Sequence, residues 1–212
     1  HSSHRRQRQM CIRDRYLAYE EKTFGDKPGL LKTERIDRIS QRNIDSSKIR
    51  NNEEKIKALK KIQKLISISG SIYFGKKVDE QLKVLRTSEE NFKKVLITVR
   101  FRATENIYRF LREELKRYPI NQIRFAKNSS AVFNDRWKDP GTGNFNLEII
   151  KDDTHPYPIE IDLPKWTVQE DIDFRRWLLG FREGIIVESP EEFVEEIKLN
   201  ILNLQGLYGI KK

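Results

Sequence analysis

The stretch from Asp171 to Tyr208 constrains the fold more than any other part of the chain, because it sets three elements in a defined order. Its first part repeats bulky apolar residues at helical spacing, which predicts an amphipathic helix with one apolar stripe. The residues of this stripe are Phe174, Trp177, Leu178 and Phe181. Ile185 to Val187 follow Gly184 as a short β-branched run, which is typical of a buried strand.

A second helix is predicted directly after this strand. Ser189 suits an N-cap, Pro190 the first helical position, and Glu191 and Glu192 the first turn. Apolar residues then repeat every three or four positions, at Val194, Ile197, Ile201 and Leu204. The tail is therefore predicted to be helix, strand, helix.

The same tail resembles the C-terminal extension of WYL-domain transcriptional regulators. The resemblance lies in the run W-L-L-x-F-x-x-x-I-x-V-x-x-P-E-E-F, from Trp177 to Phe193, followed by Leu207 and Tyr208. Members of that family usually have a glycine after the phenylalanine of this run. This chain has Arg182 there, so we expect the turn to be made at Gly184. The resemblance implies a regulator and not an enzyme.

The first fifteen residues are excluded from the fold. One reverse translation of Arg5 to Asp14 resembles a transposase-type sequencing-library adapter read in frame. The alternative, a natural basic arm that binds nucleic acid, is the weaker interpretation, because a chance match over ten consecutive residues is very improbable.

Without residues 1–15 the chain has no Met, no Cys and one histidine, His155, so we expect a fragment cut on its N-terminal side. Five arginines and one aspartate leave with them, so 42 basic and 32 acidic residues become 37 and 31, and the net charge falls from +10 to +6. Lack of cysteine argues against disulfides, thiolate catalysis and cysteine metal sites. No apolar run reaches membrane-spanning length, so a cytoplasmic protein is expected.

Two strand-like segments open the remaining chain, Tyr16 to Tyr19 and Lys32 to Ile39, with a turn predicted between Gly25 and Gly29. The first resembles the Y-L of the WYL tripeptide. The second, KTERIDRI, resembles the family's R-x-F-R-L-D-R-I strand. The resemblance implies the end of a small Sm-like or SH3-like β-barrel over residues 16–45.

Side-chain alternation in the second segment suggests a binding site. In a strand, Arg35 and Asp37 would project from one face, and Ile36 and Arg38 from the other. Asp37 could then orient a guanidinium for phosphate or carboxylate recognition. The alternative is a solvated, salt-bridged strand, which the pattern alone favours. WYL domains are thought to sense a ligand, in several cases nucleic acid, with this strand, and the resemblance reverses that preference.

We therefore expect the ligand-binding residues Tyr16, Lys32, Arg35, Asp37 and Arg38. Weaker candidates for extending a basic surface are Arg100, Arg102, Arg175 and Arg176.

Residues 46–93 are predicted to be a helical linker that joins the barrel to the tail domain. Asn51 or Asn52 could cap a helix whose lysines form a solvated face. Its expected apolar residues are Ile56, Leu59, Ile62 and Leu65. Gly70 and Gly75 break the segment, and Val78 to Leu85 suits a short helix.

Residues 94–212 are expected to form a ferredoxin-like split βαβ sandwich closed by the last helix, so the whole chain is α+β. Val95 to Arg102 alternates as a half-buried strand. A helix with Ile107, Phe110, Leu111 and Leu115 inside should follow. Further strand candidates are Ile120 to Phe125, Ala131 to Trp137, Phe145 to Ile150 and Pro158 to Leu163, with a turn at Asp139 to Asn144 and a loop around Asp152 to Pro158.

Sharper chemistries find little support in the pattern. Gly141 and Gly143 precede a predicted strand, so they offer no helix N-terminus to a phosphate. His155 lies near Asp152 and Asp153 without spaced metal-ligand partners. No nucleophile, histidine and acid can be assembled into a triad. We expect no catalytic site, metal or cofactor.

The sequence therefore favours the effector-sensing fragment of a WYL-family regulator that binds a nucleic-acid or nucleotide ligand. The resemblance implies that the intact protein binds DNA through an N-terminal winged helix-turn-helix and works as a homodimer. Three alternatives stay open: a stand-alone RNA- or single-stranded-DNA-binding module, a WYL protein encoded beside a CRISPR locus, and an enzyme whose N-terminal half is missing.

Overall fold

The computed structural model describes residues 16–21, 29–38, 51–115, 118–127 and 144–209. Their elements run in the following order: β1 (Tyr16–Glu21), β2 (Leu30–Arg35), η1 (Ile36–Arg38), α2 (Asn52–Ser69), α3 (Val78–Arg86), η2 (Glu89–Val95), β3 (Leu96–Ala103), α4 (Glu105–Glu114), η4 (Ile120–Gln122), β4 (Ile123–Ala126), β5 (Phe145–Leu147), β6 (Tyr157–Pro164), α5 (Lys165–Gln169), α6 (Ile172–Leu179), η6 (Arg182–Gly184), β7 (Ile185–Ser189) and α7 (Glu191–Leu207). The chain is thus α+β, as predicted. None of the helices described is both long and apolar enough to span a bilayer.

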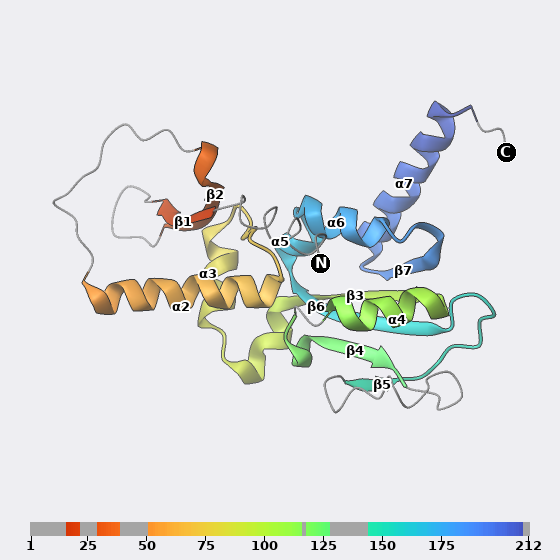
Figure 1. The fold of residues 1–212 in the computed structure, drawn as a ribbon, viewed down its shortest axis with the longest axis horizontal. Coiled ribbons are helices and arrows are strands. Elements are labelled where there is room, and N and C mark those ends of the chain that lie inside the picture. Colours follow the sequence, from red (N-terminus) through yellow and green to blue (C-terminus); the bar gives the residue numbers. More distant parts are fainter. Residues whose placement is uncertain (1–15, 22–28, 39–50, 116–117, 128–143, 210–212) are drawn as a thin grey trace, which may run out of the picture.

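A five-stranded mixed sheet organises the C-terminal part, in the order β5-β4-β6-β3-β7 (Figure 1). The neighbours β4 and β6, β6 and β3, and β3 and β7 pair antiparallel. Strand β5 lies parallel to β4 at the edge of the sheet. Helix α4 connects β3 to β4, and α5 and α6 connect β6 to β7. Each connection therefore passes over one intervening strand, which places sequence-distant strands side by side.

One face of this sheet carries the main hydrophobic core. Along β3, Val99, Phe101 and Ala103 are fully buried, while Arg100 and Arg102 alternate with them on the other face. Helices α4 and α6 and the start of α7 cover the apolar face, with Leu111, Leu115, Phe174, Leu178 and Phe193 packed into the same cluster. The prediction of which α4 residues face the core is partly wrong. Phe110 is half exposed, whereas Tyr108 is fully buried and donates a hydrogen bond from its hydroxyl to the Ala126 carbonyl at 2.8 Å.

The segment predicted to be a linker forms a second, smaller core. Leu65 and Ile68 of α2, Phe74, and Val84 of α3 pack with Leu31 and with Trp166 of α5. Asn51 begins α2 with a capping box, accepting from Glu54 N while Glu54 Oε2 accepts from Asn51 N. The first half of the apolar stripe predicted for α2 does not pack against the rest of the chain: Ile56 and Leu59 are more than half exposed.

Glycines end α2 and allow the following chain to turn back. Gly70 has φ +60 and caps α2, donating its backbone N–H to the Ile66 carbonyl. Gly75 has φ +76, and a Cβ there would lie 2.7 Å from Cβ of Trp166. The break predicted at these two residues is confirmed.

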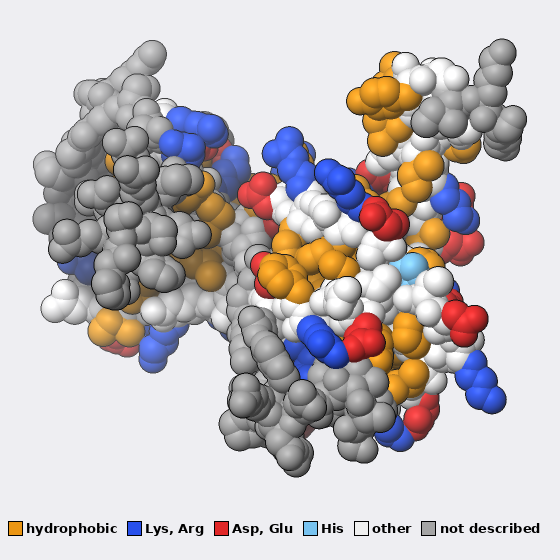
Figure 2. All heavy atoms as spheres, turned by 45° about the vertical axis from the view of Figure 1, so that its right-hand side comes forward, with side chains coloured by type: hydrophobic (Ala, Val, Ile, Leu, Met, Phe, Trp, Pro, Cys, Tyr) orange, Lys and Arg blue, Asp and Glu red, His pale blue; other side chains and the backbone are white. Residues whose placement is uncertain are grey.

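The tail is helix, strand, helix, as predicted, although its last helix begins one residue later. Pro190 is the N-cap of α7 without a side-chain cap. Ser189 instead belongs to β7, where its hydroxyl accepts from Arg100 N and donates to the Thr98 carbonyl. Helix α7 extends beyond the body of the molecule, and Figure 2 shows apolar side chains gathered on its projecting end. The exposed apolar residues of this end are Leu199, Ile201, Leu202, Leu204, Leu207 and Tyr208.

Other boundaries also differ from the predictions. Strand β4 begins at Ile123, because residues 120–122 form a turn of 3-10 helix. Strand β5 is shorter than predicted and ends at Leu147. The strand predicted at residues 131–137 and nearly all of the turn at residues 139–144 lie outside the described residues, as do residues 1–15.

Candidate functional site

The predicted ligand-binding residues gather around a two-stranded antiparallel sheet. In the register of β1 and β2, Tyr16 lies directly opposite Arg35, and Tyr19 directly opposite Lys32. Directly opposite residues share one face of an antiparallel pair, and faces alternate along each strand. Tyr16 and Arg35 therefore lie on one face and Lys32 on the other, so the structure does not bring all of the predicted residues to one surface.

The face that holds Tyr16 and Arg35 is docked onto the helices at its inner end. Leu31 is buried, and its backbone N–H and carbonyl both hydrogen-bond the side-chain amide of Gln81, at 2.9 and 2.8 Å. The same amide donates to the Phe74 carbonyl at 2.9 Å, and Thr33 Oγ1 donates to the Ile72 carbonyl at 2.7 Å. Gln81 is only 1 % exposed, so its side-chain amide supplies the hydrogen bonds that water cannot give to the buried Leu31 backbone.

The outer end of the same face is accessible. Tyr16 is 41 % exposed and Arg35 is half-buried, whereas Leu31 at the inner end is 8 % exposed. A planar guanidinium beside a phenol offers donors and an aromatic face to an anion or a base. The pair is therefore suited to bind an anionic group at the rim of the sheet.

Lys32 is tied to its own strand pair on the opposite face. Its Nζ lies 2.5 Å from Glu21 Oε2. The hydrogen bond to Glu21 raises the pKa of Lys32, so this lysine stays protonated. A ligand would have to open the ion pair with Glu21 before it could bind Lys32.

The prediction of a continuous strand from Lys32 to Ile39 is wrong beyond Arg35. Residues 36–38 turn into a 3-10 helix, so the alternation of faces stops at the end of β2. Arg38 is exposed in this turn, and its predicted place on a strand face does not apply. The side chain of Asp37, predicted to orient a guanidinium, lies outside the described residues.

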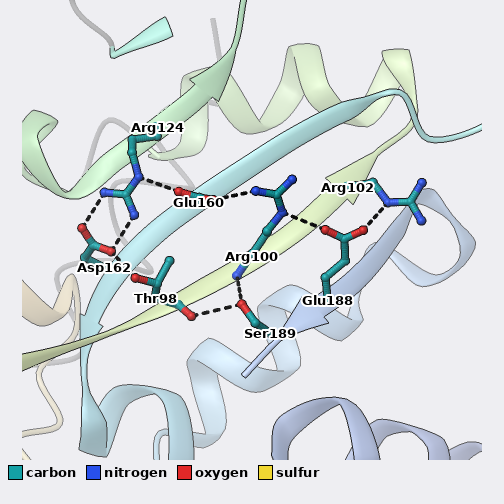
Figure 3. Close-up of polar contacts among 8 residues, drawn as sticks. All are labelled: Thr98, Arg100, Arg102, Arg124, Glu160, Asp162, Glu188 and Ser189. Carbon is teal, nitrogen blue, oxygen red and sulfur yellow. Dashed lines mark hydrogen bonds and ion pairs between the residues drawn. The ribbon is translucent and has the colours of Figure 1, made fainter. Parts of the chain in front are cut away.

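A second set of charged residues covers the polar face of the five-stranded sheet (Figure 3). Arg124 of β4 donates to both oxygens of Asp162, at 2.6 and 2.7 Å, and to Glu160 at 2.6 Å. Arg100 of β3 bridges Glu160 at 2.7 Å and Glu188 of β7 at 2.9 Å. We call the chain of contacts through Thr98, Arg100, Arg102, Arg124, Asp152, Glu160, Asp162 and Glu188 the charge ladder.

The ladder ends at the loop before β6. Arg102 Nη1 donates to Asp152 Oδ2 at 2.5 Å. Its Nε lies 2.5 Å from Glu188 Oε1, close enough for an ion pair although the N–H is not aligned as a hydrogen bond. Asp152 also accepts from the backbone of Thr154 and His155, and the His155 ring contacts the Glu183 carbonyl at 2.8 Å. His155 therefore belongs to a hydrogen-bonded loop.

Mutual pairing favours the charged forms of Arg124, Asp162 and Glu160. The hydrogen bonds to Asp162 raise the pKa of Arg124. Burial alone would raise the pKa of Asp162, but hydrogen bonds from Arg124 and Thr98 outweigh it and hold that pKa low. Burial likewise opposes the lowering of the pKa of Glu160 by its two arginines. Three guanidinium groups thus face four carboxylates, so the ladder itself carries no surplus positive charge.

The four residues predicted to extend a basic surface do not form one surface. Arg100 and Arg102 lie within the ladder on the polar face, whereas Arg175 and Arg176 lie on α6, which covers the apolar face. Arg175 forms an ion pair with Glu196 of α7, and its guanidinium carbon lies 5.2 Å from the ring centre of Phe193. Arg176 is exposed.

Sequence reasoning missed most of the ladder. Arg124, Glu160, Asp162 and Glu188 were not singled out, although Glu160 and Asp162 are spaced two apart in a strand, as are Arg100 and Arg102. Such spacing places each pair on one face, and opposite charges on neighbouring strands attract. The missing information was which strands are neighbours.

Comparison with models of known protein families, with curated proteins and with solved structures found no match to this chain.

Proposed function

We propose that this chain is the effector-sensing part of a WYL-family DNA-binding transcriptional regulator, and that it binds an anionic ligand, a nucleic acid or a nucleotide. The observation that carries the proposal is the pairing of Arg35 with Tyr16 on an accessible face of β1 and β2, with Arg38 exposed just beyond. A guanidinium beside an aromatic ring, with a second guanidinium exposed in the turn that follows the strand, suits a phosphate attached to a base.

The arrangement of the C-terminal part supports the family assignment. Strands β4, β6, β3 and β7 pair antiparallel with two helical crossovers, an arrangement that agrees with the ferredoxin-like sandwich proposed for this part, with β5 added at one edge. The tail, from α6 through β7 to α7, follows the segment whose residues resemble the WYL extension. The two-stranded sheet precedes it, where the end of an Sm-like or SH3-like barrel would lie.

The main rival, a stand-alone RNA-binding module, is less well supported. Single-strand binders of this strand order stack bases on aromatic side chains of the open sheet face. Among the described residues, the strands present charged ladder residues on that face, and the arginines are already paired with carboxylates. A base would have to displace internal ion pairs to bind there.

The remaining parts of the proposal concern the intact protein. It would bind DNA through an N-terminal winged helix-turn-helix and act in the cytoplasm as a homodimer. The apolar end of α7 would suit a contact between two copies, because its exposed stripe continues the stripe that Phe193 and Ile197 pack into the core. We propose no catalytic role.

Binding of a fluorescent single-stranded oligonucleotide to the full chain tests the proposal. Arg35→Gln/Arg38→Gln should weaken binding at least tenfold and reduce the slope of log affinity against log salt by about 0.7 per lost phosphate contact. Arg86→Gln/Lys60→Gln removes two exposed charges elsewhere and is the matched control. Unchanged affinity in the Arg35→Gln/Arg38→Gln chain, with an unaltered melting curve, would remove the proposal.

A further inference from the structure

The ring of His155 ties the loop before β6 to η6, the turn before β7. Its Nε2 lies 2.8 Å from the backbone carbonyl of Glu183, and its Nδ1 lies 2.9 Å from the hydroxyl of Thr154. His155 is 9 % exposed, so little water reaches the ring. Strands β6 and β7 both begin beside Ala103, the last residue of β3. The ring therefore joins two connections across the end of β3.

The contact with Glu183 fixes a proton on one ring nitrogen. A carbonyl oxygen has no hydrogen and can only accept, so Nε2 of His155 must donate to it. A neutral histidine has one N–H, which leaves its other nitrogen as an acceptor. A neutral ring in this position would therefore present a lone pair at Nδ1.

The contact with Thr154 shows that Nδ1 is better placed as a donor. The Thr154 hydroxyl lies 2.8 Å from Asp152 Oδ1 and 2.9 Å from His155 Nδ1. A hydroxyl has a single hydrogen and a carboxylate can only accept, so a neutral ring would set two lone pairs against each other in one of these contacts. With Nδ1 protonated, the hydroxyl donates to Asp152 and accepts from the ring. Both contacts are then hydrogen bonds.

The nearest charge favours a cationic ring. Backbone N–H groups of His155 and Thr154 donate to Asp152 and lower its pKa, so this carboxylate stays ionised. A negative charge beside an imidazole stabilises the imidazolium. Arg102 opposes this effect, but its guanidinium is shared between Asp152 and Glu188.

The other groups around the ring add no net charge. Burial raises the pKa of Tyr157 at the start of β6, so its phenol stays uncharged. The charged residues of the loop, of η6 and of the first five positions of α4 are all exposed, and three are basic and three acidic: Lys151, Arg182, Arg109, Asp153, Glu183 and Glu105. The carboxylate of Asp152 therefore dominates the field at the ring.

The turn that the ring holds depends on support from its surroundings. Arg182 in η6 has φ +50, a left-handed conformation that is costly for a residue with a side chain. Such a conformation persists only where neighbouring contacts hold it. The hydrogen bond from His155 to the next residue, Glu183, is one of these contacts.

We propose that His155 is a proton-operated latch between the loop before β6 and the turn before β7. As an imidazolium, the ring donates to Glu183 and to Thr154 and holds the two connections together. Loss of the Nδ1 proton removes the donor to Thr154 and the attraction to Asp152, so the turn at η6 and the start of β7 loosen. None of these residues belongs to β1 or β2, so the inference does not rest on the proposed function.

Ring ¹⁵N NMR spectra of the full chain between pH 5 and pH 9 test this inference. The signals of His155 are those absent from the spectrum of His155→Gln. In the folded chain the ring should stay doubly protonated to a higher pH than in the urea-unfolded chain, and Nδ1 should then lose its proton while Nε2 keeps it. Deprotonation at the same or a lower pH than in urea, or a neutral ring protonated on Nδ1, would overturn the proposal.

Two further measurements separate a latch from a ring that merely packs. The backbone amide signals of Glu183 and Gly184 should shift together with the ring, and Thr154→Val should lower the pH of this shift, whereas Thr154→Ser, which keeps the hydroxyl, should not. The folded state should bind the proton more tightly than the unfolded chain, so the stabilisation is complete in acid and is lost as the pH rises. The ratio of the folding constants of wild type and His155→Gln should thus fall about fivefold or more from pH 6 to pH 9. A constant ratio, or amides that ignore the ring, would overturn the proposal.

Discussion

Removal of Arg124 from the charge ladder should destabilise the fold by about 3 kcal/mol, because breaking a buried pair from one side costs about 3–5 kcal/mol. Arg124→Leu leaves Asp162, whose side chain is 5 % exposed, with Thr98 as its remaining ladder partner, and Glu160 with Arg100. The lower end of that range applies because the Glu160 side chain is 17 % exposed. Urea unfolding of wild type and variant at pH 7 measures the difference.

The size of this difference should depend on pH with a defined sign. Arg124 lowers the pKa values of Asp162 and Glu160 in the folded state, so their stabilising contribution is complete above the ordinary carboxyl pKa of about 4 and is lost as pH falls through the lowered values. In the variant, by contrast, protonation of the orphaned Asp162 relieves its burial. The two unfolding free energies should therefore converge as the pH is lowered from 7 to 3.

A second substitution provides the control. Arg124→Leu/Asp162→Leu removes both charges and should be more stable than Arg124→Leu alone, since apolar replacement of a whole buried pair is often neutral. A loss below about 1 kcal/mol in the single variant would match an exposed pair and refute the reasoning. A loss that does not change between pH 7 and pH 3 would refute it as well.

Two further predictions concern the supports of the fold. Gln81→Leu should lower the free energy of unfolding by about 2–3 kcal/mol, because it leaves the buried backbone groups of Leu31 and Phe74 without their hydrogen-bond partner. Hydrogen exchange at the Leu31 N–H should become faster, and unchanged protection there would contradict the prediction. Gly70→Ala should lower the free energy of unfolding by more than about 1 kcal/mol, because Gly70 has φ +60 and the new Cβ would lie 2.1 Å from Tyr118 Cε1. Gly206→Ala in α7 is the matched control, since its new Cβ meets no atom within 4 Å. Thermal melts should show the Gly206 variant to be as stable as the wild type or more stable. Equal effects of the two glycine substitutions would contradict this account.

The helix, strand, helix order of the tail was predictable, because the local sequence of each element favours the same structure as its packing in the fold. Periodicity marks α6, β-branched residues mark β7, and acidic residues mark the start of α7. Asn51 was likewise recognisable as the cap of α2. In each of these cases the determining contacts lie within a few residues of one another.

The buried face of α4 and the end of β2 were harder to predict, because contacts with residues distant in the sequence determine them. Both Phe110 and Tyr108 fit the inner face of α4 by pattern, and the deciding contacts are the Ala126 carbonyl and the ring of Tyr157, which stacks on Tyr108 at 4.7 Å. The IDRI alternation also continues past Arg35, although the strand does not. The ladder could not be assembled from the sequence, since it depends on the register among β4, β6, β3 and β7.

The face of β2 that binds the ligand tests the central claim most directly. Arg35→Gln and Lys32→Gln remove one charge each from opposite faces of the same strand, and oligonucleotide affinity can be measured for both in the full chain. The account predicts that Arg35→Gln weakens binding several-fold while Lys32→Gln, on the opposite face from Tyr16, leaves it nearly unchanged. Equal losses, or a loss confined to Lys32→Gln, would contradict it.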